Sequence, residues 1–262
     1  MHPFYIINVS NMYKAKYGGE NGRILEDGSY SLYETEKIDR EIIKLTNKDK
    51  PNYLFINHAM PLEIQESYFT TMKNIYGKKF NLECRMLKST ELEDSEKVNE
   101  LMEWADIIYE GGGDTSLMID LWKKNGFDKK LYESWNKGKV ICGISAGAVC
   151  YFNSCNSDYI IDNSVHFEVV KCLNWINLFI TPHCNEIGRM ESSKLQLTDS
   201  NLVCIMLSNC SALEIIDDKY RIITSNNDGY AYKTYWYNNK YYEEKLQLNG
   251  ELESLNYLIK RG

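Results

Sequence analysis

The sequence has 262 residues, with 30 basic and 37 acidic side chains and a formal net charge of −7. That length suits one large α/β domain or two smaller ones. Apolar residues make up 44% and charged residues 26%, which is typical of globular proteins, so wholesale disorder is excluded. The net negative charge argues against a nucleic-acid partner, because sequence-independent binding to backbone phosphates needs a basic surface.

The eight cysteines are scattered, and no two of them form a C-x-x-C pair. The first residues lack the basic stretch and the apolar core of a secretory leader. No apolar run approaches the roughly 20 residues needed to cross a bilayer. We therefore expect reduced thiols in a cytoplasmic protein that makes no use of a membrane. No cysteine or histidine pair has finger-like spacing, so neither a metal nor another cofactor is expected.

The first fifty residues combine two apolar patterns with a long polar segment. Residues 4–9 are predicted to form a buried strand, and residues 34–46 have the apolar spacing of an amphipathic helix. Residues 10–33 hold four glycines and are predicted to form a long irregular loop. The sequence leaves open whether this loop is a lid or a dimer arm.

Short apolar runs then alternate with helical periods along the chain. The predicted strands cover residues 53–56, 80–87, 106–109 and 140–144. The predicted helices cover residues 62–76, 95–104, 114–124, 131–136 and 146–152. This alternation is typical of βαβ units, whose right-handed crossovers place helices on both faces of a mostly parallel sheet. The predicted fold class is therefore α/β.

The C-terminal part of the chain has a different pattern. Residues 178–180 resemble another buried strand, and hairpins are predicted over residues 212–224 and 230–242. Their turns contain paired Asp or Asn residues, which tolerate the positive φ of tight hairpin turns. The sequence has no internal repeat and no proline-rich linker, so a single domain over residues 1–262 is predicted.

Residues 143–147, Gly-Ile-Ser-Ala-Gly, fit the pattern G-x-S-x-G. A predicted strand precedes the pattern and a predicted helix follows it, which is the setting of a nucleophile elbow. Glycines flank Ser145 because such a sharp turn leaves no room for neighbouring Cβ atoms. The alternative is a tight turn with an incidental serine.

Upstream, residues 111–115 read Gly-Gly-Gly-Asp-Thr between a predicted strand and a predicted helix. They do not fit G-x-G-x-x-G, so a dinucleotide site is poorly supported. Three glycines can present backbone N–H groups to a ligand, as an oxyanion hole requires. The alternative is a plain β–α turn capped by Asp114 or Thr115.

An acyl-transfer serine needs a base and a carboxylate that orients the base. His58 and His183 each follow an apolar strand, so both are candidates for the base at the carboxyl edge of the sheet. The chain order of serine before histidine slightly favours His183. The candidates for the acid are Asp158, Asp162 and Glu186.

Taken together, the Gly-Gly-Gly-Asp-Thr, Gly-Ile-Ser-Ala-Gly-Ala and Pro-His motifs resemble the peptidase E-like serine peptidases of family S51, which include α-aspartyl dipeptidases and, more distantly, cyanophycinases. The resemblance runs from about Pro51 to Ile223. It implies a fold like that of the class I glutamine amidotransferases, with Ser145 as nucleophile and His183 as base. The residues that it implies for the oxyanion hole and the acid are Gly112, Gly113 and Ala146, and Asp158 with Glu186 as the alternative. This chain has Asp114 where the family usually has asparagine.

The resemblance implies a serine peptidase acting on small peptides, with dipeptides that carry an N-terminal aspartate as the expected substrates. Arg189 is the candidate for binding the substrate's carboxylate, because a guanidinium can hold a carboxylate with two hydrogen bonds. The alternative is a catalytically inactive ligand-binding or sensor module on the same fold. Glutaminase chemistry is disfavoured because the elbow holds a serine rather than a cysteine. A homodimer is left open.

Three cysteines lie beside these motifs. Cys142 and Cys150 flank the predicted elbow and are expected to fill the core as small apolar groups. Cys184 directly follows His183 and is expected to be exposed enough to react.

Overall fold

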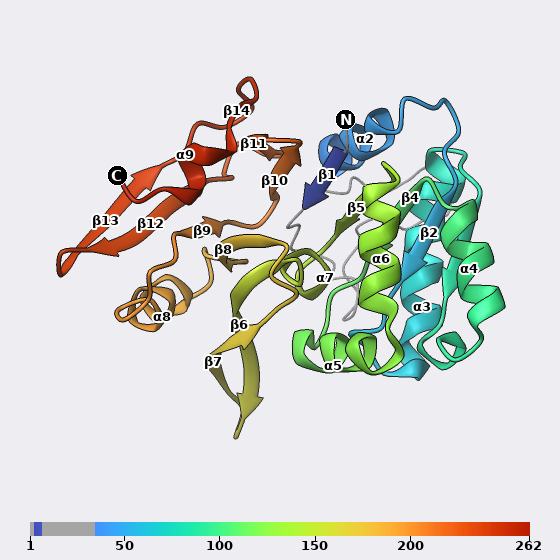
Figure 1. The fold of residues 1–262 in the computed structure, drawn as a ribbon, viewed down its shortest axis with the longest axis horizontal. Coiled ribbons are helices and arrows are strands. Elements are labelled where there is room, and N and C mark those ends of the chain that lie inside the picture. The colour runs from blue at the N-terminus through green and yellow to red at the C-terminus, as the bar shows by residue number, and fades with distance from the viewer. Residues whose placement is uncertain (1–2, 7–34) are drawn as a thin grey trace, which may run out of the picture.

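The computed structural model describes residues 3–6 and 35–262 of the chain (Figure 1). Strand β1 (Pro3–Ile6) coincides with the start of the strand predicted over residues 4–9. The loop predicted over residues 10–33 lies outside the described residues.

A four-stranded parallel sheet has the order β3-β2-β4-β5. Its strands are β2 (Tyr53–Ile56), β3 (Cys84–Leu87), β4 (Ile107–Glu110) and β5 (Val140–Gly143). The helices around it are α2 (Glu36–Leu45), α3 (Leu62–Met72), α4 (Ser95–Trp104), α5 (Thr115–Asn125), α6 (Phe127–Asn136) and the short α7 (Ala146–Val149). A π-helix (Lys73–Lys79) continues α3, and a short 3₁₀-helix (Ser89–Glu91) follows β3.

The parallel strands are buried on both faces, because their side chains alternate between two cores. Leu54 and Ile56 pack in a core with residues of α4, α5 and α6. Tyr53 and Phe55 pack in a second core with residues of α2 and α3. The predicted α/β class, with helices on both faces of a parallel sheet, is confirmed.

Three of the predicted elements have clearly different ends in the structure. The helix predicted over residues 131–136 begins already at Phe127. The strand predicted over residues 80–87 begins only at Cys84, because the preceding π-helix runs to Lys79. The helix predicted over residues 146–152 ends at Val149, because the chain enters the next strand at Phe152. The apolar run that suggested one long helix is therefore shared between a helix and a strand.

A six-stranded mixed sheet follows, with the order β13-β12-β9-β8-β6-β7. Its strands are β6 (Phe152–Ile161), β7 (Ser164–Lys171), β8 (Ile176–Thr181), β9 (Cys204–Leu207), β12 (Ala231–Tyr237) and β13 (Lys240–Lys245). Strands β6 and β7 form a long hairpin that projects from the molecule (Figure 1). The sequence does not predict this hairpin. It turns at Asp162 and Asn163, which have φ of 49° and 59°.

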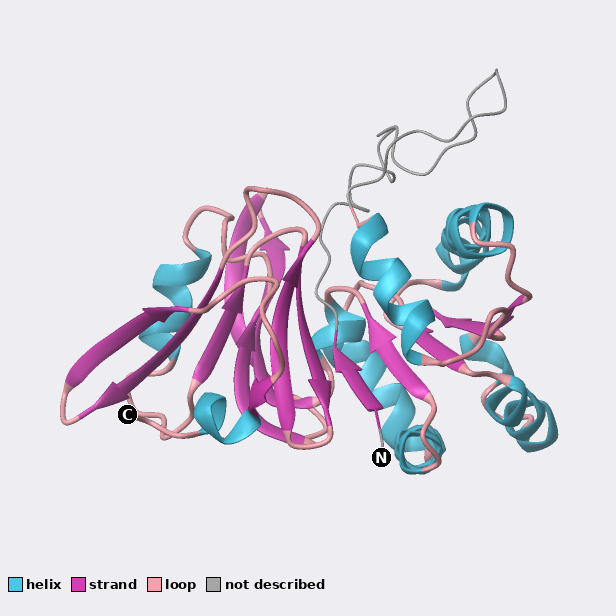
Figure 2. Cartoon of the chain, turned by 90° about the horizontal axis from the view of Figure 1, so that it is seen from above, coloured by secondary structure: helices cyan, strands magenta, loops and turns pink. Residues whose placement is uncertain are grey.

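A third, antiparallel sheet has the order β1-β10-β11-β14, which joins the N-terminal strand to the C-terminal part of the chain. The remaining elements are β10 (Ser211–Ile216), β11 (Lys219–Thr224), β14 (Glu253–Ser254), α8 (Arg189–Gln196) and α9 (Leu255–Ile259). Both predicted hairpins are present, as β10–β11 and β12–β13. Figure 2 shows the C-terminal strands gathered beside the helix-covered parallel sheet. No helix among the described residues is long and apolar enough to span a membrane.

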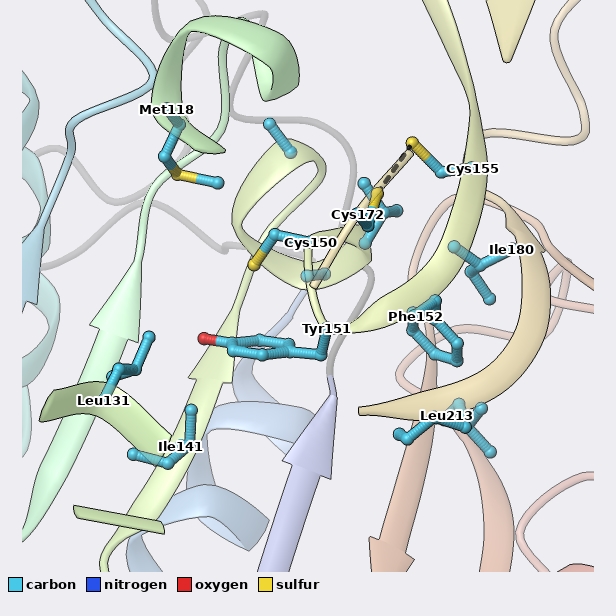
Figure 3. Packing of buried hydrophobic residues seen from close by; sticks show 14 of the residues in the cluster. Met118, Leu131, Ile141, Cys150, Tyr151, Phe152, Cys155, Cys172, Ile180 and Leu213 are labelled. Atoms are coloured by element: carbon cyan, nitrogen blue, oxygen red, sulfur yellow. Dashed lines mark hydrogen bonds between the residues drawn. The ribbon is translucent and has the colours of Figure 1, made fainter. Parts of the chain in front are cut away.

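The core beneath the predicted elbow is rich in thiols (Figure 3). Cys142 and Cys150 are fully buried, as expected of apolar fillers. The Sγ atoms of Cys155 and Cys172 lie 3.7 Å apart, and all eight cysteines are free thiols. The expectation of an exposed, reactive Cys184 is wrong: its side chain is buried, and burial raises the pKa of the thiol to about 12.

Candidate active site

Ser145 lies at the turn between β5 and α7 with φ of 53° and ψ of −120°. This conformation is strained for a residue with a side chain, and such strain is concentrated at functional sites. The two flanking glycines make the turn possible. A Cβ atom on Gly143 would lie 2.4 Å from the carbonyl oxygen of Gly147, and one on Gly147 would lie 2.3 Å from that of Glu110. The G-x-S-x-G pattern therefore forms the sharp strand–turn–helix that the sequence predicts.

His183 follows β8 and faces the serine. Its Nε2 lies 3.0 Å from the Oγ of Ser145, and both side chains are half-buried. The Nδ1 of His183 lies 3.1 Å from the Oδ1 of Asn209, which follows β9. Because an amide oxygen can only accept, Nδ1 carries the proton and Nε2 is free to accept one from the serine.

The environment keeps the imidazole neutral. Burial lowers the pKa of His183 below its ordinary value, and the nearby positive charge of Arg189 lowers it further. The carboxylates of Glu186 and Asp158 oppose this effect. A neutral imidazole in contact with a serine hydroxyl has the protonation state that a general base needs.

His58, the other candidate base, belongs to the core. Its Nδ1 accepts a hydrogen bond of 2.9 Å from the Nε1 of Trp122, and its Nε2 lies 3.0 Å from the carbonyl oxygen of Leu87. Burial lowers the pKa of His58 to about 4. The structure thus separates two histidines that the sequence barely distinguishes.

The predicted acids contact Arg189 rather than His183. The guanidinium donates to the Oδ1 of Asp158 at 2.6 Å and to the Oε2 of Glu186 at 2.9 Å, through the same NH2 group. Asp162, the third candidate, lies at the tip of the β6–β7 hairpin. Among the described residues, the hydrogen-bond partner of the His183 Nδ1 is therefore an amide and not one of the predicted carboxylates.

The same contacts bear on Arg189 as a substrate-binding residue. Its side chain is only 1% exposed, and its Nε and NH1 groups donate to Glu186 and to the backbone oxygen of Asn156. A substrate carboxylate would have to displace these partners to reach the guanidinium.

The glycine turn approaches Ser145 closely. A Cβ atom on Gly112 would lie 3.1 Å from the Cβ of Ser145, and Gly113 has φ of 145°. Hydrogen bonds to the backbone of Ile56 and Ala59 fix the N–H groups on either side of these two glycines, those of Gly111 and Asp114. The turn is thereby held close to Ser145.

Two side chains complete the glycine turn. The Asp114 side chain caps α5 by accepting from the backbone N–H of Leu117 at 2.9 Å, as the plain-turn alternative expected. The backbone N–H of Gly112 hydrogen-bonds the hydroxyl of Tyr68, whose pKa burial raises well above its ordinary value. The cap and the approach to Ser145 occur together, so the two interpretations of this turn are compatible.

A buried carboxyl lies between the glycine turn and the elbow. Glu110 is fully buried at the end of β4, and its Oε2 accepts a hydrogen bond from the hydroxyl of Tyr151 (Figure 3 shows Tyr151). Burial raises the pKa of Glu110 well above its ordinary value, which favours the neutral acid. The backbone oxygen of Glu110 accepts from Ile144, which ties β4 to the elbow.

Asn209 contacts the candidate base, and the sequence does not predict this contact. It contacts His183 because β8 and β9 are parallel neighbours, and the strand β9 was not predicted. A predicted strand over residues 204–207 could have placed Asn209 at the same carboxyl edge as His183.

Comparisons with known proteins give one family model and several similar peptidases. The sequence model of Peptidase family S51 matches residues 25–223. An uncharacterized peptidase from Bacillus subtilis (strain 168) is 27% identical over 201 residues, covering 75% of this chain and 83% of the relative. An uncharacterized peptidase from Listeria innocua is 28% identical over 122 residues, covering 44% of this chain and 57% of the relative.

Two solved structures share the fold. A peptidase from an acI-B1 Actinobacterium superimposes with a TM-score of 0.69 at 18% identity, covering 97% of this chain and 98% of that one. A putative peptidase E protein from Listeria monocytogenes EGD-e gives a TM-score of 0.53 at 21% identity, covering 70% of this chain and 91% of that one.

Proposed function

The chain belongs to peptidase family S51, and from this premise we propose that it hydrolyses small peptides by a serine mechanism. The observation that carries the proposal is the contact of 3.0 Å between the Oγ of Ser145 and the Nε2 of His183. A nucleophile and a base in hydrogen-bond contact, on a strained elbow, are the elements that acyl transfer needs.

In the acylation step, His183 takes the proton of the Ser145 hydroxyl while Oγ attacks the scissile carbonyl carbon. In this proposal the negative charge on the carbonyl oxygen is stabilised by the backbone N–H groups of Gly113 and Ala146. The N–H of Gly112 joins them when it exchanges the Tyr68 hydroxyl for the substrate oxygen. The C–N bond then breaks, and His183 passes its proton to the leaving amine. Water, deprotonated by His183, hydrolyses the acyl-enzyme and restores Ser145.

The third member of the site is Asn209 in this proposal. Its Oδ1 accepts from the Nδ1–H of His183, which holds the tautomer that leaves Nε2 free. An amide stabilises the imidazolium less than a carboxylate does. Asp158 and Glu186 act on His183 through their charge and not through a hydrogen bond.

The proposed substrates are small peptides, dipeptides included. The resemblance suggests a preference for an N-terminal aspartate, which needs a free cation in the site. Arg189, the candidate cation, is already bound by two carboxylates, so its contacts do not favour that preference. The buried thiols fit the proposed location in the reducing cytoplasm.

The test is labelling with a fluorophosphonate probe combined with dipeptide hydrolysis. We expect wild-type protein to be labelled at Ser145 and to hydrolyse dipeptides, and Ser145→Ala to lose both activities. The variant Ser164→Ala, an identical change at the exposed start of β7, is the control and retains both activities. Hydrolysis that persists in Ser145→Ala would reject the proposal.

A further inference from the structure

Three charged side chains lie beside the Ser145–His183 pair. Arg189, at the start of α8, is enclosed by Asp158 from β6 and Glu186 from the turn after β8. The backbone N–H of Glu186 donates to the carbonyl oxygen of His183 at 2.9 Å, so Glu186 and the base share one tight turn. Asp158, Glu186 and Arg189 all contribute to the electrostatic environment of the His183 ring.

The exposure of these side chains is unequal. The arginine side chain is 1% exposed, whereas the side chains of Asp158 and Glu186 are 46% and 48% exposed. The ion pairs use Oδ1 of Asp158 and Oε2 of Glu186. The second oxygen of each carboxylate is therefore left to a group that arrives from solvent.

The charges of the cluster do not balance. Two carboxylates and one guanidinium leave one net negative charge next to a neutral imidazole, and the positive member is the one that solvent cannot reach. The Oδ1 of Asn156, two residues before Asp158 on β6, is buried and has no hydrogen-bond partner among the described residues. The two members of the cluster that solvent reaches are both acceptors, as expected of a region that binds an incoming donor.

The Ser145–His183 pair marks, independently of these charges, where the reacting carbonyl of a substrate lies. We propose that Asp158 and Glu186 are specificity-determining residues that select peptides carrying a cation close to the scissile bond. The cation is an ammonium or a guanidinium, contributed by the free N-terminus or by a basic side chain. This inference rests on the proposed peptidase function and reverses the charge preference that Arg189 suggests from the sequence.

The experiment uses four dipeptides that separate the two sources of cation. They are Lys-Ala and norleucyl-Ala, each with a free and with an acetylated N-terminus. A free N-terminus should raise kcat/KM about tenfold over the acetylated form if the site binds the α-ammonium. If the site binds the side chain, kcat/KM should be about tenfold higher for the lysyl than for the norleucyl peptide. A factor of about ten corresponds to one partly desolvated charge contact.

The variants are Glu186→Gln and Asp158→Asn, each of which leaves Arg189 one carboxylate partner. We expect each to reduce the preference for the cationic substrate about three- to tenfold, with a larger loss of kcat/KM for cationic than for neutral peptides. Asp162→Asn is the matched control at the tip of the same hairpin and keeps the wild-type preference. High salt should weaken the preference in the wild type.

The outcomes separate the two proposals. Equal kcat/KM for all four peptides, with Ser145 labelled by the fluorophosphonate, would overturn the charge selection and leave the serine mechanism intact. A uniform fall for all peptides in Asp158→Asn would assign that residue to orienting the base instead. Labelling of Ser145 without hydrolysis of any dipeptide would reject the substrate class. Absence of both labelling and hydrolysis would remove both proposals.

Discussion

Asn209 and His183 are 26 residues apart in the chain, and Oδ1 of the amide lies 3.1 Å from Nδ1 of the imidazole. The contact fixes the ring through a neutral acceptor in the place where serine hydrolases commonly use a carboxylate. The backbone N–H of Asn209 in turn donates to the side chain of Asn185, two residues after His183. Asn209, which follows β9, thereby holds both the ring of His183 and the turn that contains Asn185.

Replacing Asn209 by alanine should lower kcat about tenfold, because the imidazolium loses a hydrogen bond worth about 1.4 kcal/mol. Asn209→Asp should keep activity and raise the pKa that governs the acid limb, because a carboxylate stabilises the imidazolium. Kinetics over a range of pH test both expectations, with Asn201→Ala as an exposed control. Unchanged kcat in a folded Asn209→Ala protein would show that the amide plays no part.

The acid limb of kcat/KM should lie below pH 6.5 in the wild type. The base works only when neutral, and burial together with the charge of Arg189 lowers the pKa of His183. As the pH falls through this lowered pKa, the imidazole becomes protonated and activity is lost. A pH–rate profile with a neutral dipeptide measures the midpoint, and a value at or above 6.5 would contradict the proposed environment.

Gly147→Ala should destabilise the protein by about 2 kcal/mol, within the range for inserting a methyl group into a packed core. The new Cβ would lie 2.3 Å from the carbonyl oxygen of Glu110, so either β4 or α7 must move. Gly138→Ala is a useful comparison, because Gly138 has φ of 82° but no atom near its Cβ position. Gly138→Ala thus measures the cost of backbone strain alone. Its free energy of unfolding in urea should lie between those of the wild type and Gly147→Ala.

His58 should make stability depend on pH. Its pKa is about 4 in the folded protein and near 6.5 in the unfolded chain, so the unfolded state binds the proton more tightly. This contribution is fully present above pH 6.5 and falls by about 3 kcal/mol as the pH drops toward 4. His58→Gln should show a shallower loss of stability than the wild type over that range, measured by chemical unfolding. Parallel curves for the two proteins would contradict the assignment.

The sequence predicts those features that depend on neighbouring residues. The apolar runs give the four strands of the parallel sheet, and the glycines around Ser145 give the elbow. Both features are local, since the glycines are needed by the turn that contains them. The Asp and Asn pairs likewise give both C-terminal hairpins.

The features that the sequence does not predict depend on contacts between distant segments. Asn209 reaches His183 only because β9 pairs with β8. Asp158 has the chain position of a triad acid, but Arg189, 31 residues later, binds its carboxylate. The β6–β7 hairpin has many exposed apolar side chains, among them Ile160 and Val165, so its pattern does not show the alternation of a half-buried strand.

The burial of the thiols offers a way to follow unfolding. Seven of the eight cysteines are buried, and Cys84 alone is partly accessible. Burial also raises the pKa of the Cys84 thiol to about 12, so a thiol-reactive dye should modify at most this one site in the folded molecule, and only slowly. In the unfolded chain it should modify all eight thiols rapidly. The stoichiometry of labelling then counts unfolded molecules directly, without a spectroscopic baseline. It also implies that the protein can carry one dye at Cys84, on the parallel sheet, while the proposed catalytic serine stays unmodified.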